Sequence, residues 1–341
     1  MNKYNFLNVY RLIMAILVVI CHTNVLTNII SQNIMVSNIY NFLVQLAVPF
    51  FFLSTGFFLG KKIEKSNNST DEIEIIKKKR NKTIKLYIFF TIIYLPLTIY
   101  GFISEKTGII KSIILFFRGF LFVGENFNSW FLWYLLSEII GLTFIATLLK
   151  KRNNYKTILF KGLLLFTIGI IISFINSQTY DDIIMAYIST ILKFFIPNGR
   201  IFYSIVFTSI GIIISEKEIK VKKMIILKII PISMTLLLFL INTVFYNIFV
   251  NRFSILLCSV LIFVFIINIR FNNDKFADYC KFMSEKLYFW HMYIYSFVSL
   301  IIDGFIYYNY GATYFVLTMI IALIIFTPMY YICKRNLKEK K

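Results

Sequence analysis

The sequence has few charged residues and is poor in histidine and proline. Only 15% of its 341 residues are charged, whereas 59% are hydrophobic and 18% are aromatic. A water-soluble domain of this length carries a larger share of charge, so the composition excludes an ordinary soluble globular protein. Membrane spans are the simplest interpretation of the apolar excess.

Cysteine is scarce as well. Cys21, Cys258, Cys280 and Cys333 lie far apart in or beside apolar segments, with no CxxC pair and no histidines at metal-ligand spacing. We therefore expect neither a disulfide framework nor a bound metal.

Acidic residues are outnumbered by basic ones, which gives a formal net charge of +20. A basic chain can bind nucleic acid, but here the basic residues form short clusters between long apolar runs. That distribution is typical of the cytoplasmic loops of a membrane protein. We expect the lipid bilayer as a partner and no nucleic acid.

Ten apolar segments have about the length that a bilayer span requires. They lie at residues 6–26, 39–59, 84–103, 130–149, 157–175, 201–215, 224–246, 253–269, 286–303 and 312–333. Because a bilayer leaves unpaired backbone groups without partners, each span should be an α-helix. The predicted fold class is all-α, a polytopic membrane protein with about ten transmembrane helices. Because no small-residue cleavage site follows Arg11, the first segment is expected to be a retained span.

Basic residues alternate between successive loops. Nine lie at 60–85 and five from Lys334 onward, whereas none lie at 26–39 or 303–311. Cytoplasmic loops are enriched in Lys and Arg, so this pattern predicts that both termini are cytoplasmic.

The predicted layout is a single transmembrane domain over residues 1–341. It has a basic cytoplasmic loop at 60–85, an outer interfacial segment at 104–129 and a cytoplasmic tail at 334–341. Within the outer segment, residues 109–122 are expected to form an amphipathic helix on the membrane surface. Residues 180–195 are expected to be interfacial or re-entrant.

Arg11 and His22 lie within the first predicted span, where an ionisable group is costly and therefore a functional candidate. Eleven steps of about 100° return to nearly the same helix face, roughly 16 Å along the axis. A neutral imidazole can take a proton from a hydroxyl, and a guanidinium suits phosphate or carboxylate. The pair indicates group transfer, although a packing role for His22 stays open.

Two further ionisable groups lie in spans. The other histidine, His291, is a second candidate for the site, and helix packing is its alternative role. Glu138 lies about 12 Å inside the fourth span. It must be protonated or paired there, and Arg11, Arg200 and Lys161 are its candidate partners.

Other candidates stand near span ends. Arg200 follows Asn198 and Gly199 at the mouth of span six, where it is either a site residue or an interfacial arginine that snorkels. Trp130 and Trp133 are typical of an outer interfacial belt, with a site role also open for Trp133.

The second span combines a proline with small polar residues. Pro49 should kink this helix, and Ser54 and Gly56 would let another helix approach closely. Packing is therefore the simplest role for these small residues.

In order along the chain, these motifs resemble acyltransferase family 3, whose mark is Arg-x10-His in the first helix, here Arg11 to His22. Later landmarks are also similar. They are Val48-Pro-Phe-Phe-Phe-Leu-Ser-Thr-Gly-Phe-Phe-Leu59, Leu132-Trp-Tyr134, Asn198-Gly-Arg200 and Leu287-Tyr-x-x-His291. The resemblance covers nearly the whole chain.

The resemblance implies a multi-pass protein of the bacterial cell membrane that transfers an acyl group, commonly acetyl from cytoplasmic acetyl-CoA. The implied acceptor is a hydroxyl of an envelope glycan or its lipid-linked precursor. His22 would act as general base or as an acyl relay, and Arg11 would hold CoA phosphate or orient the site. Glu138 completes the candidate catalytic set. The candidate substrate-binding residues are Ser54, Thr55, Trp133, Tyr134, Asn198, Arg200, Tyr288 and His291.

The sequence departs from the family pattern at several points. Ser54-Thr55-Gly56 stands where Ser-Gly is common, and His291-Met292 stands where His-Pro is common. Many relatives carry a fused extracellular esterase-like domain, whereas this chain ends at Lys341. It is expected to complete the transfer alone, as a homo-oligomer or with a partner protein.

Two other classes of function stay open. The chain also resembles the membrane half of the serine racemases of glycopeptide resistance, which suggests a transporter of a small solute such as serine. A transporter is expected to have paired halves with broken helices, and five prolines without a visible repeat give no such signal. A structural or assembly protein would not need a buried charged pair in its first span.

Overall fold

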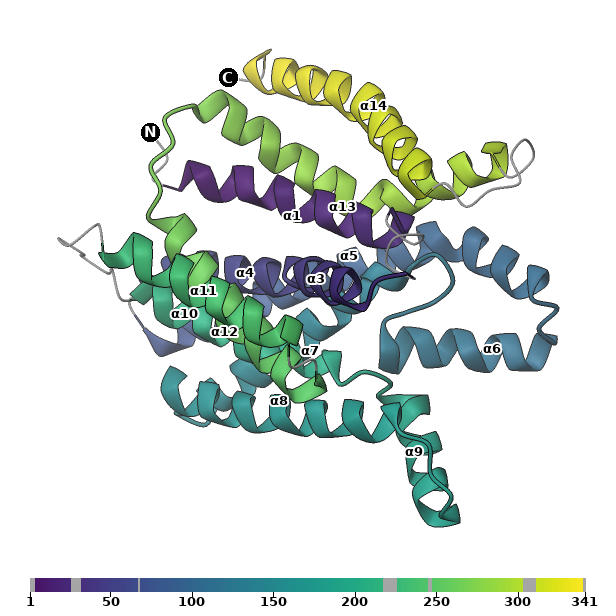
Figure 1. The fold of residues 1–341 in the computed structure, drawn as a ribbon. Coiled ribbons are helices and arrows are strands. Elements are labelled where there is room, and N and C mark those ends of the chain that lie inside the picture. The colour runs from purple at the N-terminus through teal and green to yellow at the C-terminus, as the bar shows by residue number, and fades with distance from the viewer. Residues whose placement is uncertain are drawn as a thin grey trace. The chain divides into compact units, whose positions relative to one another are not determined.

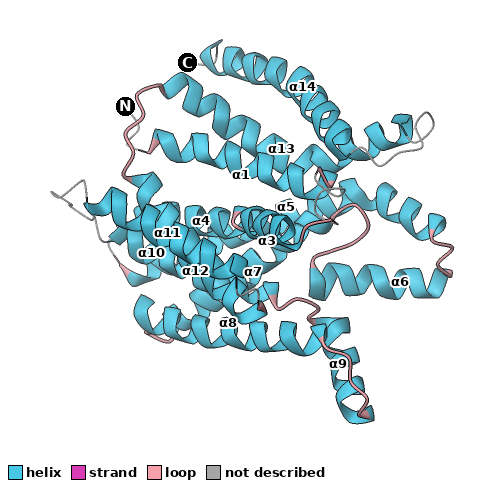
Figure 2. Ribbon diagram, viewed as in Figure 1, coloured by secondary structure: helices cyan, strands magenta, loops and turns pink. Residues whose placement is uncertain are grey.

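The computed structural model describes residues 4–25, 32–66, 68–216, 226–244, 247–302 and 311–339. Within these ranges every regular element is a helix, and no strand occurs (Figure 2). The all-α fold class is confirmed. The helices before residue 130 are α1 (Asn5–Thr23), α3 (Ile34–Gln45), α4 (Ala47–Ile63), α5 (Ser69–Ser104), α6 (Ile109–Arg118) and the π-helical turn η1 (Gly119–Val123). Those after it are η2 (Trp130–Leu132), α7 (Trp133–Lys150), α8 (Tyr155–Ser177), α9 (Ile183–Phe195), η3 (Arg200–Phe202), α10 (Tyr203–Glu216), α11 (Ile226–Val244), α12 (Ile248–Ile267), α13 (Asp274–Ile302) and α14 (Gly311–Glu339).

Seven helices of the described ranges are long and apolar enough to cross a membrane. Helix α9 and the stretch Arg200–Glu216, bent by 48°, give an eighth span if the pair is counted as one. The two predicted spans that this test leaves out correspond to α11 and to α13. The first half of α13 is rich in charged residues, which lowers its hydropathy. The chain is a multi-pass membrane protein, while the count of ten and the orientation stay predictions.

The chain divides into two compact units. Unit 1 comprises Met1–Ala47, Met224–Tyr246 and Leu257–Lys341, and unit 2 comprises Val48–Lys223 and Asn247–Leu256. Unit 1 contains α1, α3, α11, α13 and α14, whereas unit 2 contains α5 to α10 and nearly all of α4.

In unit 1, α1 and α13 run parallel and side by side (Figure 1). At their beginnings the Asn5 amide donates to the carboxylate of Asp274, 269 residues later in the chain. The same offset brings His22 to His291 near the other end of α1. Two parallel spans must be separated by an odd number of others, as the predicted first and ninth spans are.

Helix α14 runs back along this pair. Its first residue, Gly311, lies against the end of α1, where an added Cβ would come within 2.1 Å of the Asn24 carbonyl oxygen. Near its other end, Thr327 lies 2.9 Å from the Tyr279 hydroxyl, early in α13. Helix α1 therefore begins, and α14 ends, at the same end of unit 1 (Figure 1).

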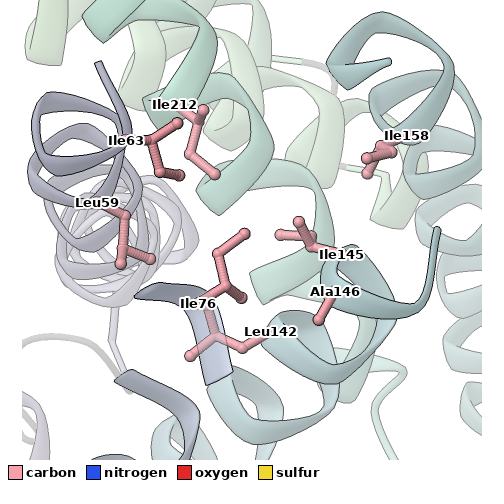
Figure 3. Packing of buried hydrophobic residues seen from close by; sticks show 8 residues of the cluster. All are labelled: Leu59, Ile63, Ile76, Leu142, Ile145, Ala146, Ile158 and Ile212. Carbon is pink, nitrogen blue, oxygen red and sulfur yellow. The ribbon is translucent and has the colours of Figure 1, made fainter. Parts of the chain in front are cut away.

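The core of unit 2 includes a cluster of aliphatic side chains from α4, α5, α7, α8 and α10 (Figure 3). Its buried members are Leu59, Ile63, Ile76, Leu142, Ile145, Ala146, Ile158 and Ile212. Lys61, Lys62 and Lys150 follow closely in sequence on the same helices. The cluster therefore lies at the basic end of the unit, which the loop charges predict to be cytoplasmic.

Most of the predicted basic loop at 60–85 is helical. Helix α4 continues to Ile63, and α5 begins at Ser69. Asp71 and Glu72 in the first turn of α5 favour a helix start there, because acidic side chains stabilise the positive end of the helix dipole. Lysine and arginine are good helix formers, so the basic residues extend α5 instead of forming a loop.

The structure also shows the expected kink at Pro49 and the expected helix from residue 109. The second span is broken between Gln45 and Ala47, because the ring of Pro49 clashes with the carbonyl four residues earlier, that of Gln45. Residues 109–118 form the expected helix, α6, whose side chains Ile109, Ile110 and Ile113 are exposed. Its location on the membrane surface stays a prediction.

The predicted cytoplasmic tail at 334–341 is largely helical. Its residues through Glu339 continue α14, and 340–341 lie outside the described residues.

Candidate functional site

The candidate residues fall into two groups. Unit 1 holds Arg11, His22, Tyr288 and His291, whereas unit 2 holds Ser54, Thr55, Trp133, Tyr134, Glu138, Asn198 and Arg200.

The structure brings the two histidines of the chain together. The rings of His22, from α1, and His291, from α13, are stacked with centroids 5.2 Å apart and planes inclined by 30°. Sequence analysis selected both residues but gave no reason to expect contact between them. Within unit 1, this pair forms the centre of the candidate active site.

His291 is held in place by its own helix. Its ring is fully buried, and its Nδ1 lies 3.0 Å from the carbonyl oxygen of Leu287 and 2.9 Å from that of Tyr288. Carbonyl oxygens only accept hydrogen bonds, so Nδ1 carries the proton. In a neutral ring, Nε2 then has the lone pair and can accept a proton or a hydrogen bond.

Arg11 lies on the same face of α1 as His22. Helix α1 is unbroken from Asn5 to Thr23. Leu7, Met14 and Val18 are buried, and Arg11 and His22 continue their spacing of three and four residues along one face. The predicted alignment of the cation with the imidazole is therefore preserved along α1.

Tyr40, a residue that sequence analysis did not select, lies close to this end of α1. Its hydroxyl on α3 donates to the carbonyl oxygen of Ile20 at 2.9 Å. The bond ties α3 to α1 two residues before His22. Tyr288 is buried on α13, one turn before His291.

In unit 2, Glu138 is paired, but with none of the expected partners. Its side chain is only 1% exposed, and its Oε1 lies 2.7 Å from Nζ of Lys79. Arg200 instead pairs with Glu125, and Lys161 donates to Asn153. The expected partners were wrong because Lys79 was assigned to a loop, whereas it lies on α5, which packs along α7.

The small polar residues of α4 have separate surroundings. Thr55 lies near Tyr134, with hydroxyl oxygens 3.5 Å apart, and the Phe52 ring lies 4.7 Å from that of Tyr134. Ser54 is fully buried. At Gly56 an added Cβ would lie 2.1 Å from the carbonyl oxygen of Thr208, so α4 and α10 meet there backbone to backbone. This contact supports the packing interpretation of Gly56.

The remaining candidates of unit 2 line a small pocket near the start of α7. Arg200, Trp133 and Asn198 contribute to it, together with Glu125 and Ser137, which sequence analysis missed. The Arg200 guanidinium lies 5.4 Å from the Trp133 ring centroid, and its Nη1 lies 3.4 Å from Oε1 of Glu125. We call this the Glu125–Arg200 pocket.

The backbone around Arg200 is fixed by small residues. Gly199 has a φ of 62°, and an added Cβ there would lie 2.1 Å from the carbonyl oxygen of Gly169. Glycine alone suits both this close approach and this backbone conformation. The Ser137 hydroxyl lies 3.2 Å from the carbonyl oxygen of Arg200 and 3.0 Å from that of Ile201, and it accepts a bond from the Ser204 amide.

One sequence signal pointed to Glu125. It is the only acidic residue between Glu105 and Glu138. Burial raises the pKa of its carboxyl, and the nearby Arg200 and Arg118 guanidinium groups oppose that shift. Among the described residues, no cluster of three or more His, Cys, Asp or Glu side chains is arranged to hold a metal.

Comparison of the sequence with known proteins finds one matching family and two relatives. A family model for the acyltransferase domain of acyltransferase family 3 matches residues 4–338. The chain is also similar to two Enterococcus faecalis proteins that are each named amino-acid racemase. It is 27% identical to one of them over 280 residues, which are 78% of this chain and 38% of that protein. It is 28% identical to the other over 170 residues, which are 50% of this chain and 22% of that protein.

The chain spans less than half the length of each racemase that it matches. No solved structure matches it. The family model, by contrast, covers nearly the whole sequence, including all the candidate residues in both units. The chain therefore belongs to acyltransferase family 3.

Proposed function

We propose that this membrane acyltransferase moves an acyl group, acetyl in the simplest case, from cytoplasmic acyl-CoA to a hydroxyl of an envelope glycan or its lipid-linked precursor. The location would be a bacterial plasma membrane. The observation that carries the proposal is the stacking of His22 on His291. Helix α1 places Arg11 on the same face as His22, and the ring of His22 meets the ring of His291 from α13. A cation and two imidazole rings therefore lie along one side of α1.

The proposed chemistry requires one base. His22 takes the proton of the acceptor hydroxyl while the oxygen bonds to the thioester carbonyl carbon. The carbon–sulfur bond then breaks, and the sulfur of the departing CoA receives the proton. In the alternative relay, a nitrogen of His22 bonds to the acyl carbon while the carbon–sulfur bond breaks, and CoA leaves as its thiol with the imidazole proton. The acceptor oxygen then bonds to the acyl carbon, the carbon–nitrogen bond breaks, and the hydroxyl proton returns to His22.

Arg11 is suited to binding the acyl donor, acyl-CoA. It lies eleven residues before His22, nearer the end of α1 that is predicted to be cytoplasmic. A guanidinium binds phosphate through paired donors, so Arg11 would hold a CoA phosphate or orient the site. His291, with Nδ1 committed to its own helix, would fix the ring of His22 or bind the acceptor hydroxyl through Nε2.

The proposal is tested with His22→Ala and Arg11→Ala in the full chain, reconstituted in liposomes with labelled acetyl-CoA and a membrane fraction as acceptor. We expect each variant to insert normally and to lose acetyl transfer. Cys21→Ala is the control, since it changes the neighbouring residue on another side of the helix. Full acetylation by both His22→Ala and Arg11→Ala would refute the proposal.

A second candidate function is transport of a small solute, such as serine. An amino-acid racemase aligns with 78% of this chain, which makes an amino acid the solute class of this candidate. The same liposomes discriminate the two functions, because uptake of labelled serine needs no acyl donor. Serine uptake that His22→Ala abolishes, without acetyl transfer by the unmodified chain, would support transport.

A further inference from the structure

Helix α5 of unit 2 presents four exposed lysines on one side, within a sector of about 140° at 100° per residue. They are Lys77, Lys78, Lys82 and Lys85. We call these four residues the basic face of α5. The opposite side of the same turns holds Ile76, Thr83 and Tyr87, which are all buried. This part of α5 is therefore two-sided, with one buried side and one basic side.

The rotation of α5 about its axis is fixed by contacts on the buried side. Lys79 points toward α7, where its Nζ lies 2.7 Å from Oε1 of Glu138. Ile76 belongs to the aliphatic cluster of unit 2. Turning the basic face inward would break the buried ion pair and expose Ile76. The four lysines are therefore held on the side of α5 that points away from α7.

The same side of α5 becomes apolar directly after the basic face. Ile88, Phe89 and Ile92 fall in the sector of the four lysines, and each of them is exposed. From Leu86 to Ser104 the helix rises about 27 Å, which is close to the thickness of a bilayer's hydrocarbon core. The apolar part of this side therefore faces lipid tails, and the basic face begins where the tails end.

The basic face has the height of a lipid headgroup layer. Lys77 and Lys85 are separated by about 12 Å along the helix axis, whereas the headgroup region of one leaflet is about 5–8 Å thick. Lys82 and Lys85 therefore lie at the level of the lipid phosphates. Lys77 and Lys78 lie just beyond that level, within reach of it through their long side chains.

Acidic side chains do not neutralise the basic face. Within the part of the chain that the structure describes, no ion pair involves any of its four lysines. Glu74 is the exposed acidic residue on the same side, and it precedes the lysines by about one turn. An ammonium group is a compact charge that attracts phosphate, so the face suits a ligand with net negative charge.

We propose that the basic face of α5 binds the headgroup phosphates of anionic glycerophospholipids, in the leaflet that the loop charges predict to be cytoplasmic. Basic clusters next to a membrane span attract anionic lipid in this way. A soluble acidic partner fits less well, because the lysines share their side of the helix with side chains that face lipid tails. The inference concerns unit 2 alone and does not depend on acyl transfer.

The test measures which lipids the full chain retains. The chain is reconstituted at low salt in liposomes of equal parts phosphatidylcholine and phosphatidylglycerol, extracted, and weighed with its bound lipids by native mass spectrometry. Phosphatidylcholine is the reference lipid, because it carries a phosphate but no net charge. We expect retained lipid to be enriched in phosphatidylglycerol. Equal retention of the two lipids by the unmodified chain would overturn the inference without any variant.

A triple variant, Lys78→Gln with Lys82→Gln and Lys85→Gln, tests the location. Each lysine near an anionic membrane contributes about a fivefold preference, so the variant should lose the preference about tenfold to hundredfold. The same three positions changed to arginine keep the charge and should keep the preference. Loss of the preference in the arginine variant, or its persistence in the glutamine variant, would overturn the inference.

Helix α13 offers a matched control with the same change in charge on the same predicted side of the membrane. The three lysines changed to glutamine are Lys275, Lys281 and Lys286. Asp278 and Glu285 alternate with them along α13 and reduce their local potential. This control should retain phosphatidylglycerol as the unmodified chain does. A loss as large as that of the α5 glutamine variant would assign the effect to net charge and overturn the place of the site on α5.

Salt provides a readout that needs no substitution. In about 1 M potassium chloride the screening length is about 3 Å, so exposed lysines should attract lipid headgroups only weakly. Liposomes equilibrated in that salt before extraction should give a chain without preference for phosphatidylglycerol. An unchanged preference would mean that the exposed lysines do not hold the lipid, and it would overturn the inference.

Discussion

His22 on α1 and His291 on α13 are 269 positions apart in the sequence, and their rings are stacked with centroids 5.2 Å apart. The parallel register of α1 and α13, which also joins Asn5 to Asp274, produces this contact. Because Nδ1 of His291 is bonded to α13, the ring of His291 is a fixed surface against which His22 is oriented.

Truncating His291 should therefore impair catalysis through His22. We expect His291→Ala to lower kcat about tenfold to hundredfold, the cost of misplacing a catalytic group by about 1 Å. His291→Phe keeps an aromatic ring beside His22 and should retain more of kcat than His291→Ala. Steady-state acetyl transfer by detergent-purified variants gives both values.

The pH profile separates positioning from direct proton transfer. If His22 is the base and His291 only orients it, His291→Phe should keep the acidic limb of the kcat profile at the pH of the unmodified chain. Equal kcat in His291→Ala and the unmodified chain would contradict a positioning role.

The sequence was sufficient to select both histidines but not to pair them. Polar residues are costly in lipid, so His22 and His291 could each be recognised without a structure. Which helices lie side by side depends on packing over the whole chain, and no local pattern states that α1 adjoins α13. The contact between them is therefore a product of tertiary structure.

The ion pair of Glu138 shows a different limit. Its burial within a span predicted a partner, and the candidate partners were residues of spans or of span mouths. Hydropathy locates the apolar part of a helix and not its charged extension, so Lys79 was taken for a loop residue. The acidic first turn of α5 was the available signal that the helix begins at Ser69.

Removing Lys79 should destabilise unit 2. Lys79→Met leaves the carboxylate of Glu138 buried without its partner, which costs about 3–5 kcal/mol for a fully buried pair. Because a third of the Lys79 side chain is exposed, we expect about 1–3 kcal/mol here. The thermal midpoint of the detergent-purified protein, followed by size-exclusion chromatography, measures the loss.

A double variant tests whether the charge itself matters. Lys79→Met combined with Glu138→Gln removes both charges and should recover much of the lost midpoint. A double variant no more stable than Lys79→Met would show that Glu138 does not depend on Lys79.

Gly56 should tolerate no side chain, because α4 and α10 meet there without space. Gly56→Ala places a Cβ 2.1 Å from the Thr208 carbonyl oxygen, so the two backbones must separate. We expect a loss of about 1–3 kcal/mol, the usual cost of overpacking, and a lower yield of folded protein. Gly108→Ala is a matched control, because no atom lies within 4 Å of its added Cβ. An equal midpoint for the two variants would contradict close approach at Gly56.

Folding stability should depend on the ionisation of Glu125. Because burial makes the pKa of Glu125 higher in the folded protein than in the unfolded chain, the folded state binds more protons between the two values. Stability from this group is therefore present at low pH and is lost as pH rises through the folded pKa. Thermal midpoints of the detergent-purified protein in a pH series measure this dependence. Glu125→Gln should abolish it, and a variant that kept it would assign the pH dependence to another group.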